Sequence, residues 1–277
     1  KFSKKHIMII PNRPAAGLEK YNIPVVSPSS INDFVGYRTK WCLRKIFGYN
    51  FPTNCAMERG TCTEKGVQPI LEGIATEDEG IELALKNFDK KCNPDMKNYH
   101  TERATIPYLI KGAVKEIQNN LGKLHTYQAK IEGVLHEYKF YGYTDFVLEN
   151  TSTGKKTIVD LKTTKRTPSK LASSHARQIA LYSKALECDA VLLYLVPHKV
   201  TDRKTKKVSY RTEGIWYELE DREKHLEEAY KIIRTMDTLL YNCNDKNEVA
   251  DMCYPNVDDW FWDSPELIEA RKKVWGI

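Results

Sequence analysis

The sequence contains no long apolar run, and its longest uninterrupted one, Ala190–Val196, has seven residues. A helix that spans a bilayer needs about 20 consecutive apolar residues, so the composition offers no candidate for a membrane span. Near the start, the apolar patch Ile7–Ile10 has only four residues. The apolar core of a secretory signal takes about 7 to 15. We therefore expect a cytoplasmic protein with no membrane partner.

Cysteine is scarce as well, because the seven cysteines form an odd set that is spread over the whole chain. Secreted disulfide scaffolds are short and dense in paired cysteines, so the sequence excludes that class and favours free thiols. Repeats of fixed period and low-complexity tracts are also absent, which excludes solenoids. With 41% hydrophobic and 29% charged residues, the 277-residue chain predicts a folded, soluble protein.

Charge of one sign is in small excess, since 43 Lys and Arg stand against 37 Asp and Glu and give a formal net charge of +6. Such an excess favours a polyanionic partner without proving one. The strongest local run of positive charge is the segment Lys199–Lys207. Most runs of this kind are solvated hairpin tips, and contact of this one with DNA is the alternative.

The pattern of apolar residues predicts an arm followed by one folded domain. The prolines among residues 1–26 predict an extended N-terminal arm, and residues 27–277 predict a single domain. The expected parts of this domain are a mainly helical part (27–122), a sheet core (123–219) and C-terminal helices (220–277). Together they predict an α/β (α+β mixed) fold with a mixed central β-sheet flanked by helices, plus a helical N-terminal region.

Individual elements follow from the spacing of the apolar residues. One helix is expected over Ile31–Phe47, a basic loop over Lys199–Lys207, and two helices at the end of the chain. Stretches rich in Tyr, Val, Ile, Phe and Thr predict strands. Three antiparallel strands are expected over Tyr127–Leu135, Lys139–Glu149 and Lys156–Thr163.

The most informative stretch runs from Gly142 to Thr164, where two predicted strands flank a turn. If Asn150 pairs with Lys155, the numbers of paired residues sum to 305. This register places Asp145 directly opposite Asp160, with their Cβ atoms about 4.5 to 5.5 Å apart. Two carboxylates at that distance repel each other when both are ionised. The pair therefore favours a cation between its members.

A hard divalent ion such as Mg²⁺ or Mn²⁺ is one such cation, because it takes oxygen ligands and pairs with phosphate substrates. Lys162 shares a strand face with Asp160, since side chains alternate along a strand. Its ammonium group can stabilise negative charge that develops on a phosphate in the transition state. From the residues alone, a solvated strand face with a Lys–Asp pair is the favoured interpretation, because an Asp-x-Lys sequence by itself is common.

Two segments of this stretch, Gly142–Asp145 (Gly-Tyr-Thr-Asp) and Asp160–Thr163 (Asp-Leu-Lys-Thr), resemble the core of the PD-(D/E)XK nuclease superfamily. The resemblance covers roughly Ser27–Tyr182 and implies a restriction-endonuclease-like core. Further matches to the RecB-like branch, which includes the CRISPR adaptation nucleases, are Ser27–Cys42 for its first helix, Arg59–Glu64 at the place of its Gly-x-x-x-His motif, and Gln178–Tyr182 for its Gln-x-x-x-Tyr motif.

The resemblance also implies roles for particular residues. Glu64, Asp145, Asp160 and Lys162 would be catalytic, and Lys162 would support the attacking water or the transition state. The metal ligands would be Glu64, Asp145, Asp160 and the backbone carbonyl of Leu161, and the substrate-binding residues Gln178, Tyr182 and Arg177. For Tyr182 a core position is the alternative, and for Arg177 a solvated helix charge.

Two departures from the family pattern concern metals. Glu64 stands where the RecB-like branch usually has a histidine, and it keeps an oxygen ligand suited to Mg²⁺. Some relatives bind an iron–sulfur cluster through one early and three late cysteines. Here Cys42 has the early position, but the late region offers only Cys243 and Cys253. A four-thiolate cluster lacks a ligand, so we do not expect one.

The expected function is that of a Mg²⁺- or Mn²⁺-dependent DNA exonuclease in recombination or end processing. Stand-alone proteins of this kind occur in phage and bacterial recombination systems, and a phage origin would place this one in the host cytoplasm. Its partners would be DNA with a free end and a recombination protein. The alternatives are an endonuclease on the same core and a catalytically silent DNA-binding module. Because the chain has no P-loop motif, any ATP-driven unwinding would come from another chain.

Overall fold

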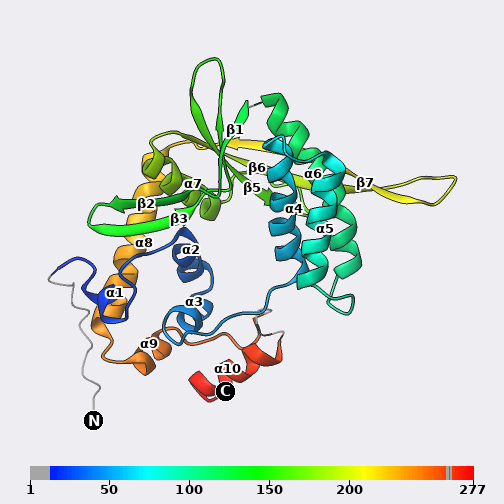
Figure 1. Ribbon diagram of the computed structural model, residues 1–277. Helices are drawn as coiled ribbons and strands as arrows, with labels where there is room; N and C mark the ends of the chain where they lie inside the picture. Colours follow the sequence, from blue (N-terminus) through cyan, green and yellow to red (C-terminus); the bar gives the residue numbers. More distant parts are fainter. Residues whose placement is uncertain (1–12, 121, 260–261, 263) are drawn as a thin grey trace, which may run out of the picture. The chain divides into compact units, whose positions relative to one another are not determined.

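The computed structural model describes residues 13–120, 122–259, 262 and 264–277, which form helices and strands of a mixed α/β protein (Figure 1). The chain divides into two compact units that are interleaved along the sequence. Unit 1 comprises Lys1–Pro52, Glu132–Gly142 and Glu223–Ile277, and unit 2 comprises Thr53–Ile131 and Tyr143–Arg222. That residues 27–277 form a single domain stays a prediction. No helix in the described ranges combines the length and apolar character of a membrane span.

Unit 2 is built on a five-stranded sheet with the strand order β1-β4-β5-β6-β7. Strands β5 and β6 are parallel, whereas the other neighbouring pairs are antiparallel, so the predicted mixed sheet is confirmed. The elements of this unit are α4 (Cys55–Leu71), α5 (Glu77–Lys91), α6 (Tyr99–Asn120), β1 (Lys123–Tyr127), β4 (Phe146–Glu149), β5 (Lys156–Thr163), α7 (Ser173–Leu186), β6 (Asp189–Thr201) and β7 (Val208–Glu218).

Helices α4, α5 and α6 cover one face of this sheet. Buried side chains from the three helices, such as Val67, Phe88 and Ile110, form one apolar core with Val159 and Leu161 of β5. Because successive side chains of a strand point to opposite faces, the residues of β5 that alternate with these two face the other side of the sheet. Helix α7 packs against β5 and β6 on that second side.

Unit 1 is mainly helical and carries the two-stranded sheet β2–β3. Its elements are α1 (Ala16–Lys20), α2 (Pro28–Gly36), α3 (Arg38–Lys45), β2 (Lys130–Leu135), β3 (Tyr138–Tyr143), α8 (Arg222–Asn242), α9 (Lys246–Met252) and α10 (Pro265–Trp275). Three helices therefore close the described chain, and the expectation of two was wrong. The expected single helix over Ile31–Phe47 is also wrong, because Tyr37 leaves the helical conformation (φ −148°, ψ 68°) and separates α2 from α3.

An extended N-terminal arm was expected over residues 1–26. This expectation is wrong for residues 16–20, which form the helix α1. The first twelve residues lie outside the described ranges. The carboxylate of Asp237, which is buried, accepts backbone N–H groups of Ala15, Gly17 and Leu18 at 2.8 to 3.1 Å. Unpaired N–H groups at the start of a helix need such acceptors. Since the acceptor lies more than 200 residues away along the chain, local sequence does not show this helix.

The expected strand over Lys139–Glu149 is in fact two strands that belong to different sheets, β3 and β4. The break falls at Thr144, which lies between the two strands, and its N–H donates to the carbonyl of Ala129, the residue before β2, at 3.0 Å. Asp145 follows at once. The expected loop at Lys199–Lys207 is shorter than predicted, because β6 and β7 stay paired up to Thr201 and Val208.

Candidate active site

The central strand β5 carries Asp160 and Lys162 on the face that lies toward α7. Asp160 is fully buried (0% exposed), and the side chain of Lys162 is 27% exposed. The ammonium nitrogen Nζ of Lys162 lies 2.5 Å from Oδ2 of Asp160 and 3.8 Å from Oδ2 of Asp145. The predicted face-sharing of Asp160 and Lys162 is therefore confirmed, and a single ammonium group serves two carboxylates.

Asp145 reaches this pair because it stands where the β4–β5 ladder ends. The observed register pairs Phe146 with Val159, and these numbers sum to the predicted 305. The next pair would join Asp145 to Asp160, but the paired register ends before it. At this point the side chain of Asp145, and not its backbone, contacts β5. Its Oδ2 accepts the N–H of Leu161 at 2.8 Å. A carboxylate thus replaces the backbone acceptor of a continuing ladder, which holds it beside β5.

The electrostatics of the three groups explain why Lys162 stays between the carboxylates. Burial raises the pKa of Asp145 well above its usual value, and the negative charge of Asp160 raises it further. Burial alone would lower the pKa of Lys162, but the charges of Asp160 and Asp145 outweigh it, and the net shift is upward. Lys162 is therefore protonated at neutral pH and supplies the positive charge that the carboxylate pair requires.

Glu64 approaches the same groups from α4. Burial raises the pKa of Glu64, while the charge of Lys162 acts in the opposite direction, so the two groups are close enough to interact. Gln128 holds this carboxylate, because its Nε2 donates to Oε1 of Glu64 at 3.0 Å. The backbone N–H of Gln128 donates to the carbonyl of Asp145 at 3.0 Å. Sequence reasoning missed Gln128, an exposed residue in a turn that nothing in the local sequence distinguishes.

Helix α7 contributes the predicted Gln-x-x-x-Tyr pair. Nε2 of Gln178 donates to Oδ1 of Asp160 at 2.8 Å and lies 3.1 Å from the hydroxyl of Tyr182. Tyr182 is buried, and its pKa is raised by burial and by the charges of Asp160 and Asp145, so the hydroxyl keeps its proton. One helix face therefore carries both residues, as residues four apart do, and Gln178 holds the buried carboxylate.

The remaining two predicted site residues are placed differently. Arg177 lies on α7 and is only 9% exposed. One helical position corresponds to about 100° of rotation, so Arg177 points to a different side of the helix from Gln178. Leu161 lies on β5 between Asp160 and Lys162, and its side chain belongs to the core under α4–α6. Binding of DNA by Arg177 and of metal by the Leu161 carbonyl both stay predictions.

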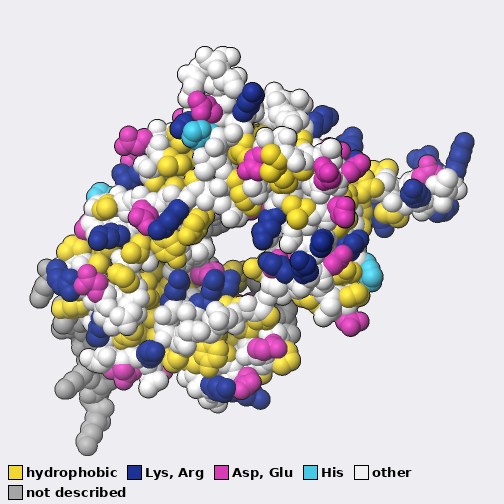
Figure 2. Space-filling model, in the orientation of Figure 1, with side chains coloured by type: hydrophobic (Ala, Val, Ile, Leu, Met, Phe, Trp, Pro, Cys, Tyr) yellow, Lys and Arg dark blue, Asp and Glu magenta, His cyan; other side chains and the backbone are white. Residues whose placement is uncertain are grey.

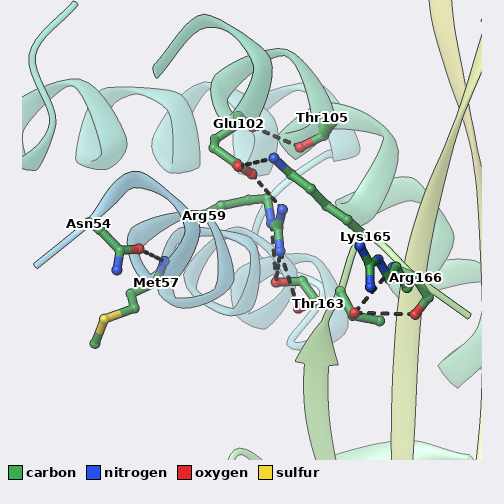
Figure 3. Close-up of polar contacts among 9 residues, drawn as sticks. Asn54, Met57, Arg59, Glu102, Thr105, Thr163, Lys165 and Arg166 are labelled. Carbon is green, nitrogen blue, oxygen red and sulfur yellow. Dashed lines mark hydrogen bonds and ion pairs between the residues drawn. The ribbon is translucent and has the colours of Figure 1, made fainter. Parts of the chain in front are cut away.

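A buried ionic network that sequence reasoning missed joins α4 and α6 to the end of β5 (Figure 3). Arg59 of α4 donates from Nε and Nη2 to Oγ1 of Thr163 at 3.2 and 3.1 Å, and from Nη2 to the Thr163 carbonyl at 3.1 Å. Its Nη1 lies 2.5 Å from Oε2 of Glu102, a side chain that is 1% exposed. Lys165 pairs with the other Glu102 oxygen at 2.5 Å.

The position of this network explains its importance for the site. Thr163 directly follows Lys162, and Arg59 lies five residues before Glu64 on α4. A Cβ atom at Gly60 would lie 3.3 Å from Oγ1 of Thr163, so glycine allows α4 this close to the strand. The network therefore sets the position of α4, and with it Glu64, relative to β5. The sequence gives one indication of this network: Arg59 and Glu102 are charged, yet they stand among the buried positions of α4 and α6.

The donor set of the site fits a hard divalent ion. Glu64, Asp145 and Asp160 offer carboxylate oxygens, the donors that Mg²⁺ and Mn²⁺ prefer, and the raised pKa of Asp145 indicates a site that favours added positive charge. Within the described ranges, no three His, Cys, Asp or Glu side chains are already arranged as a metal centre. The ammonium group of Lys162 supplies the counter-charge in this arrangement.

The cysteines considered for a cluster lie in unit 1. Cys42, Cys243 and Cys253 are buried free thiols. The side chain of Cys42 is hydrogen-bonded to that of Cys253, and this contact together with burial raises the pKa of Cys42. Among the residues that the structure describes, no group of three or more His, Cys, Asp or Glu side chains, these cysteines included, is arranged to hold a metal ion.

The raised pKa of Asp145 predicts how stability depends on pH when divalent metal is removed. An unfolded Asp titrates near 3.9, whereas folded Asp145 holds its proton to higher pH. Between the two pKa values the folded chain binds more protons, so the free energy of unfolding is expected to fall as pH rises through this window. Urea unfolding in EDTA, from pH 4 to 8, measures this fall in the wild type and in Asp145→Asn.

The variant Asp145→Asn cannot ionise at this position and should show a smaller fall, of which Glu64, whose pKa is also raised, keeps its part, while the exposed substitution Asp95→Asn should keep the whole fall. Equal pH profiles for the wild type and Asp145→Asn would show that the carboxyl group is not perturbed.

Comparison with known proteins adds a family to this geometry. The model of the PD-(D/E)XK nuclease superfamily matches residues 25–253. A search of curated protein sequences finds no match. Among solved structures, 29 chains match; one of them, the crystal structure of SSO0001, is 15% identical with a TM-score of 0.31, and the match covers 80% of this chain and 96% of that one. Because the family model spans well over half of its residues, the chain belongs to the PD-(D/E)XK nuclease superfamily.

Proposed function

We propose that this protein is a Mg²⁺- or Mn²⁺-dependent DNA exonuclease that hydrolyses phosphodiester bonds during recombination or end processing. Membership of the superfamily supports metal-dependent nuclease activity. The observation that carries the proposal is the arrangement of Asp145, Asp160 and Lys162, where one protonated amine on the central strand lies within 4 Å of two carboxylates. Structural strands avoid this arrangement, because buried charges are costly.

Each residue of the site has a role in this proposal. Asp145, Asp160 and Glu64, with the Leu161 carbonyl, would hold the metal, which lowers the pKa of a bound water and polarises the phosphate. Lys162 donates hydrogen bonds to the phosphate oxygens as negative charge develops on them. Gln178 holds Asp160 in place, and the hydroxyl of Tyr182 lies beside the Gln178 amide. Both side chains would also lie beside the DNA, with Arg177 as a further phosphate contact.

Two alternatives use the same scaffold. An endonuclease would share the chemistry and differ only in the topology of its substrate. A silent DNA-binding module would not need the Lys162–Asp160 pair, so the presence of both residues favours catalysis. A recombination protein as partner, and a place in the cytoplasm, are further parts of the proposal.

The experiment that tests the proposal compares linear with covalently closed circular DNA, in Mg²⁺, Mn²⁺ or EDTA. We expect digestion of linear DNA alone, only with metal. Cutting of circles would replace the exonuclease by an endonuclease. Binding of both DNAs without cleavage of either would support the silent module.

A further inference from the structure

The β6–β7 hairpin extends beyond the sheet and ends in a basic tip (Figure 1). We propose that this hairpin is an arm that binds the phosphate backbone of duplex DNA at a distance from the active site. The inference rests on the proposed function only in taking DNA as the substrate. It assigns to the arm a binding surface that is separate from the residues of the catalytic strand.

The charge of the tip is concentrated and unpaired. The segment 199–208 carries five positive side chains and one negative side chain, a net charge of +4. Figure 2 shows Lys and Arg side chains together at this projecting end. All five cations are exposed, and within the described chain none of them forms an ion pair. They are Lys199, Arg203, Lys204, Lys206 and Lys207.

The single carboxylate of the tip does not neutralise these cations, because it shapes the turn. Oδ1 of Asp202 accepts the N–H of Lys204 at 3.0 Å and both the N–H and hydroxyl of Thr205 at 2.6 and 2.8 Å. These hydrogen bonds lower the pKa of Asp202. Two backbone bonds close the turn: the N–H of Asp202 donates to the carbonyl of Lys207 at 2.9 Å, and the N–H of Lys206 donates to the carbonyl of Asp202 at 3.0 Å. The charges are thus presented on an ordered turn.

The base of the arm is held firmly by α6. The hydroxyl of Thr212 donates to the carbonyl of Tyr108 at 2.7 Å, and the ring of Tyr210 packs edge-on against that of Tyr108 at 5.7 Å. Nε1 of Trp216 donates to Glu116 at 2.9 Å. An arm with a fixed base loses less conformational freedom on binding than a flexible loop does.

The chemistry of the tip favours phosphates over bases. Residues 199–209 contain no aromatic side chain, whereas proteins that bind single strands stack bases on aromatic rings. Tyr210, the nearest aromatic residue, is already packed on α6. Lys and Arg without stacking partners contact the backbone of a duplex independently of its sequence.

The reach of the arm follows from the strand register. Lys162 pairs with Tyr194 of the parallel strand β6, and the tip begins eight residues further on at Asp202. At about 3.3 Å per residue, the tip lies about 26 Å along the strand from the level of Lys162. Duplex DNA rises about 3.4 Å per base pair, so this distance corresponds to about 8 base pairs. A duplex that is bound at the active site therefore reaches the tip only when it is longer than this.

The test measures binding of a 30-base-pair DNA duplex in EDTA, so that no cleavage occurs. The tip variant is Arg203→Gln, Lys204→Gln, Lys206→Gln and Lys207→Gln. Its matched control removes the same charge from exposed lysines of unit 2 that form no ion pair, Lys86→Gln, Lys90→Gln, Lys97→Gln and Lys115→Gln. A charge-keeping variant, Lys204→Arg, Lys206→Arg and Lys207→Arg, shows whether charge alone matters.

We expect the tip variant to bind at least about 10-fold more weakly. The slope of log K against log salt concentration should be shallower by about 2 to 4, since each lost phosphate contact removes about 0.9 from this slope. The control and the charge-keeping variant should bind within about 2-fold of the wild type. On a capped duplex of six base pairs, the tip variant should equal the wild type. Equal binding by the tip variant and the control on the long duplex would overturn the proposal.

Two further outcomes separate this inference from the proposed function. If the tip variant lost affinity for duplex RNA but not for duplex DNA, the arm would be an RNA-binding element and the inference would fail. If the protein cleaved no DNA but the tip variant still lost DNA binding, the arm would stand and the nuclease proposal would fail.

Discussion

Replacement of Lys162 by methionine is expected to lower the rate of DNA cleavage by about 10² to 10³-fold or more, the loss seen when a group that stabilises transition-state charge is removed. Lys162 is the protonated amine that lies between Asp160 and Asp145, and methionine keeps the length of the side chain without its charge. Initial rates on linear DNA, with saturating Mg²⁺ or Mn²⁺, measure the effect. The matched control is Lys156→Met, an exposed lysine on the same face of β5.

The same variant separates metal binding from catalysis. Because the ammonium group pairs with both carboxylates, it competes with a divalent ion for them. Lys162→Met should therefore bind Mn²⁺ at least as tightly as the wild type, which calorimetry measures without reference to activity. Unchanged cleavage by Lys162→Met would move the catalytic amine elsewhere, and loss of Mn²⁺ binding would show that Lys162 organises the carboxylates instead of competing for them.

Replacement of Arg59 by methionine is expected to lower the free energy of unfolding by about 3 to 5 kcal/mol, as for other buried ion pairs that lose one partner. Arg59 and Glu102 have side chains that are 4% and 1% exposed, so the Glu102 carboxylate would stay buried with Lys165 alone. Thr163 would lose its side-chain and backbone contacts with α4. Urea unfolding at neutral pH measures the change.

Two control variants make this prediction specific. Lys165→Met removes the half-exposed partner of Glu102 and should cost about 0 to 1 kcal/mol, because solvent already screens that pair. The double variant Arg59→Met, Glu102→Met removes both buried charges and should recover most of the loss. If Arg59→Met cost no more than Lys165→Met, the network would not hold α4 to β5.

Much of the site was predictable, because its main features follow from local periodicity. The alternation of a strand places Asp160 and Lys162 on one face, and the spacing of four residues places Gln178 and Tyr182 on one side of a helix. The turn after β4 sets the register, and the paired numbers sum to 305 as expected. Each of these relations spans fewer than about twenty residues, within which geometry depends on the local backbone alone.

The relations that sequence reasoning missed all join distant segments. The Asp237 carboxylate caps the start of α1 by accepting N–H groups more than 200 residues away, Arg59 contacts Thr163 across 104 positions, and Gln128 contacts Glu64 across 64. None of these contacts produces a periodic pattern in the sequence. A single polar residue in a helix or turn gives the same sequence pattern whether its hydrogen bonds are made to solvent or to a buried partner.

The chain alone thus specified its superfamily core, the strand with Asp160 and Lys162, and the register that opposes Asp145 to them, because short-range pairing and side-chain alternation are encoded in neighbouring residues. The folded structure decided which polar groups hold these carboxylates in place, how α4 is fixed to β5, and where the basic hairpin projects. Those outcomes depend on burial, since a buried charge or N–H group must find a partner. The fold selects that partner from anywhere in the chain.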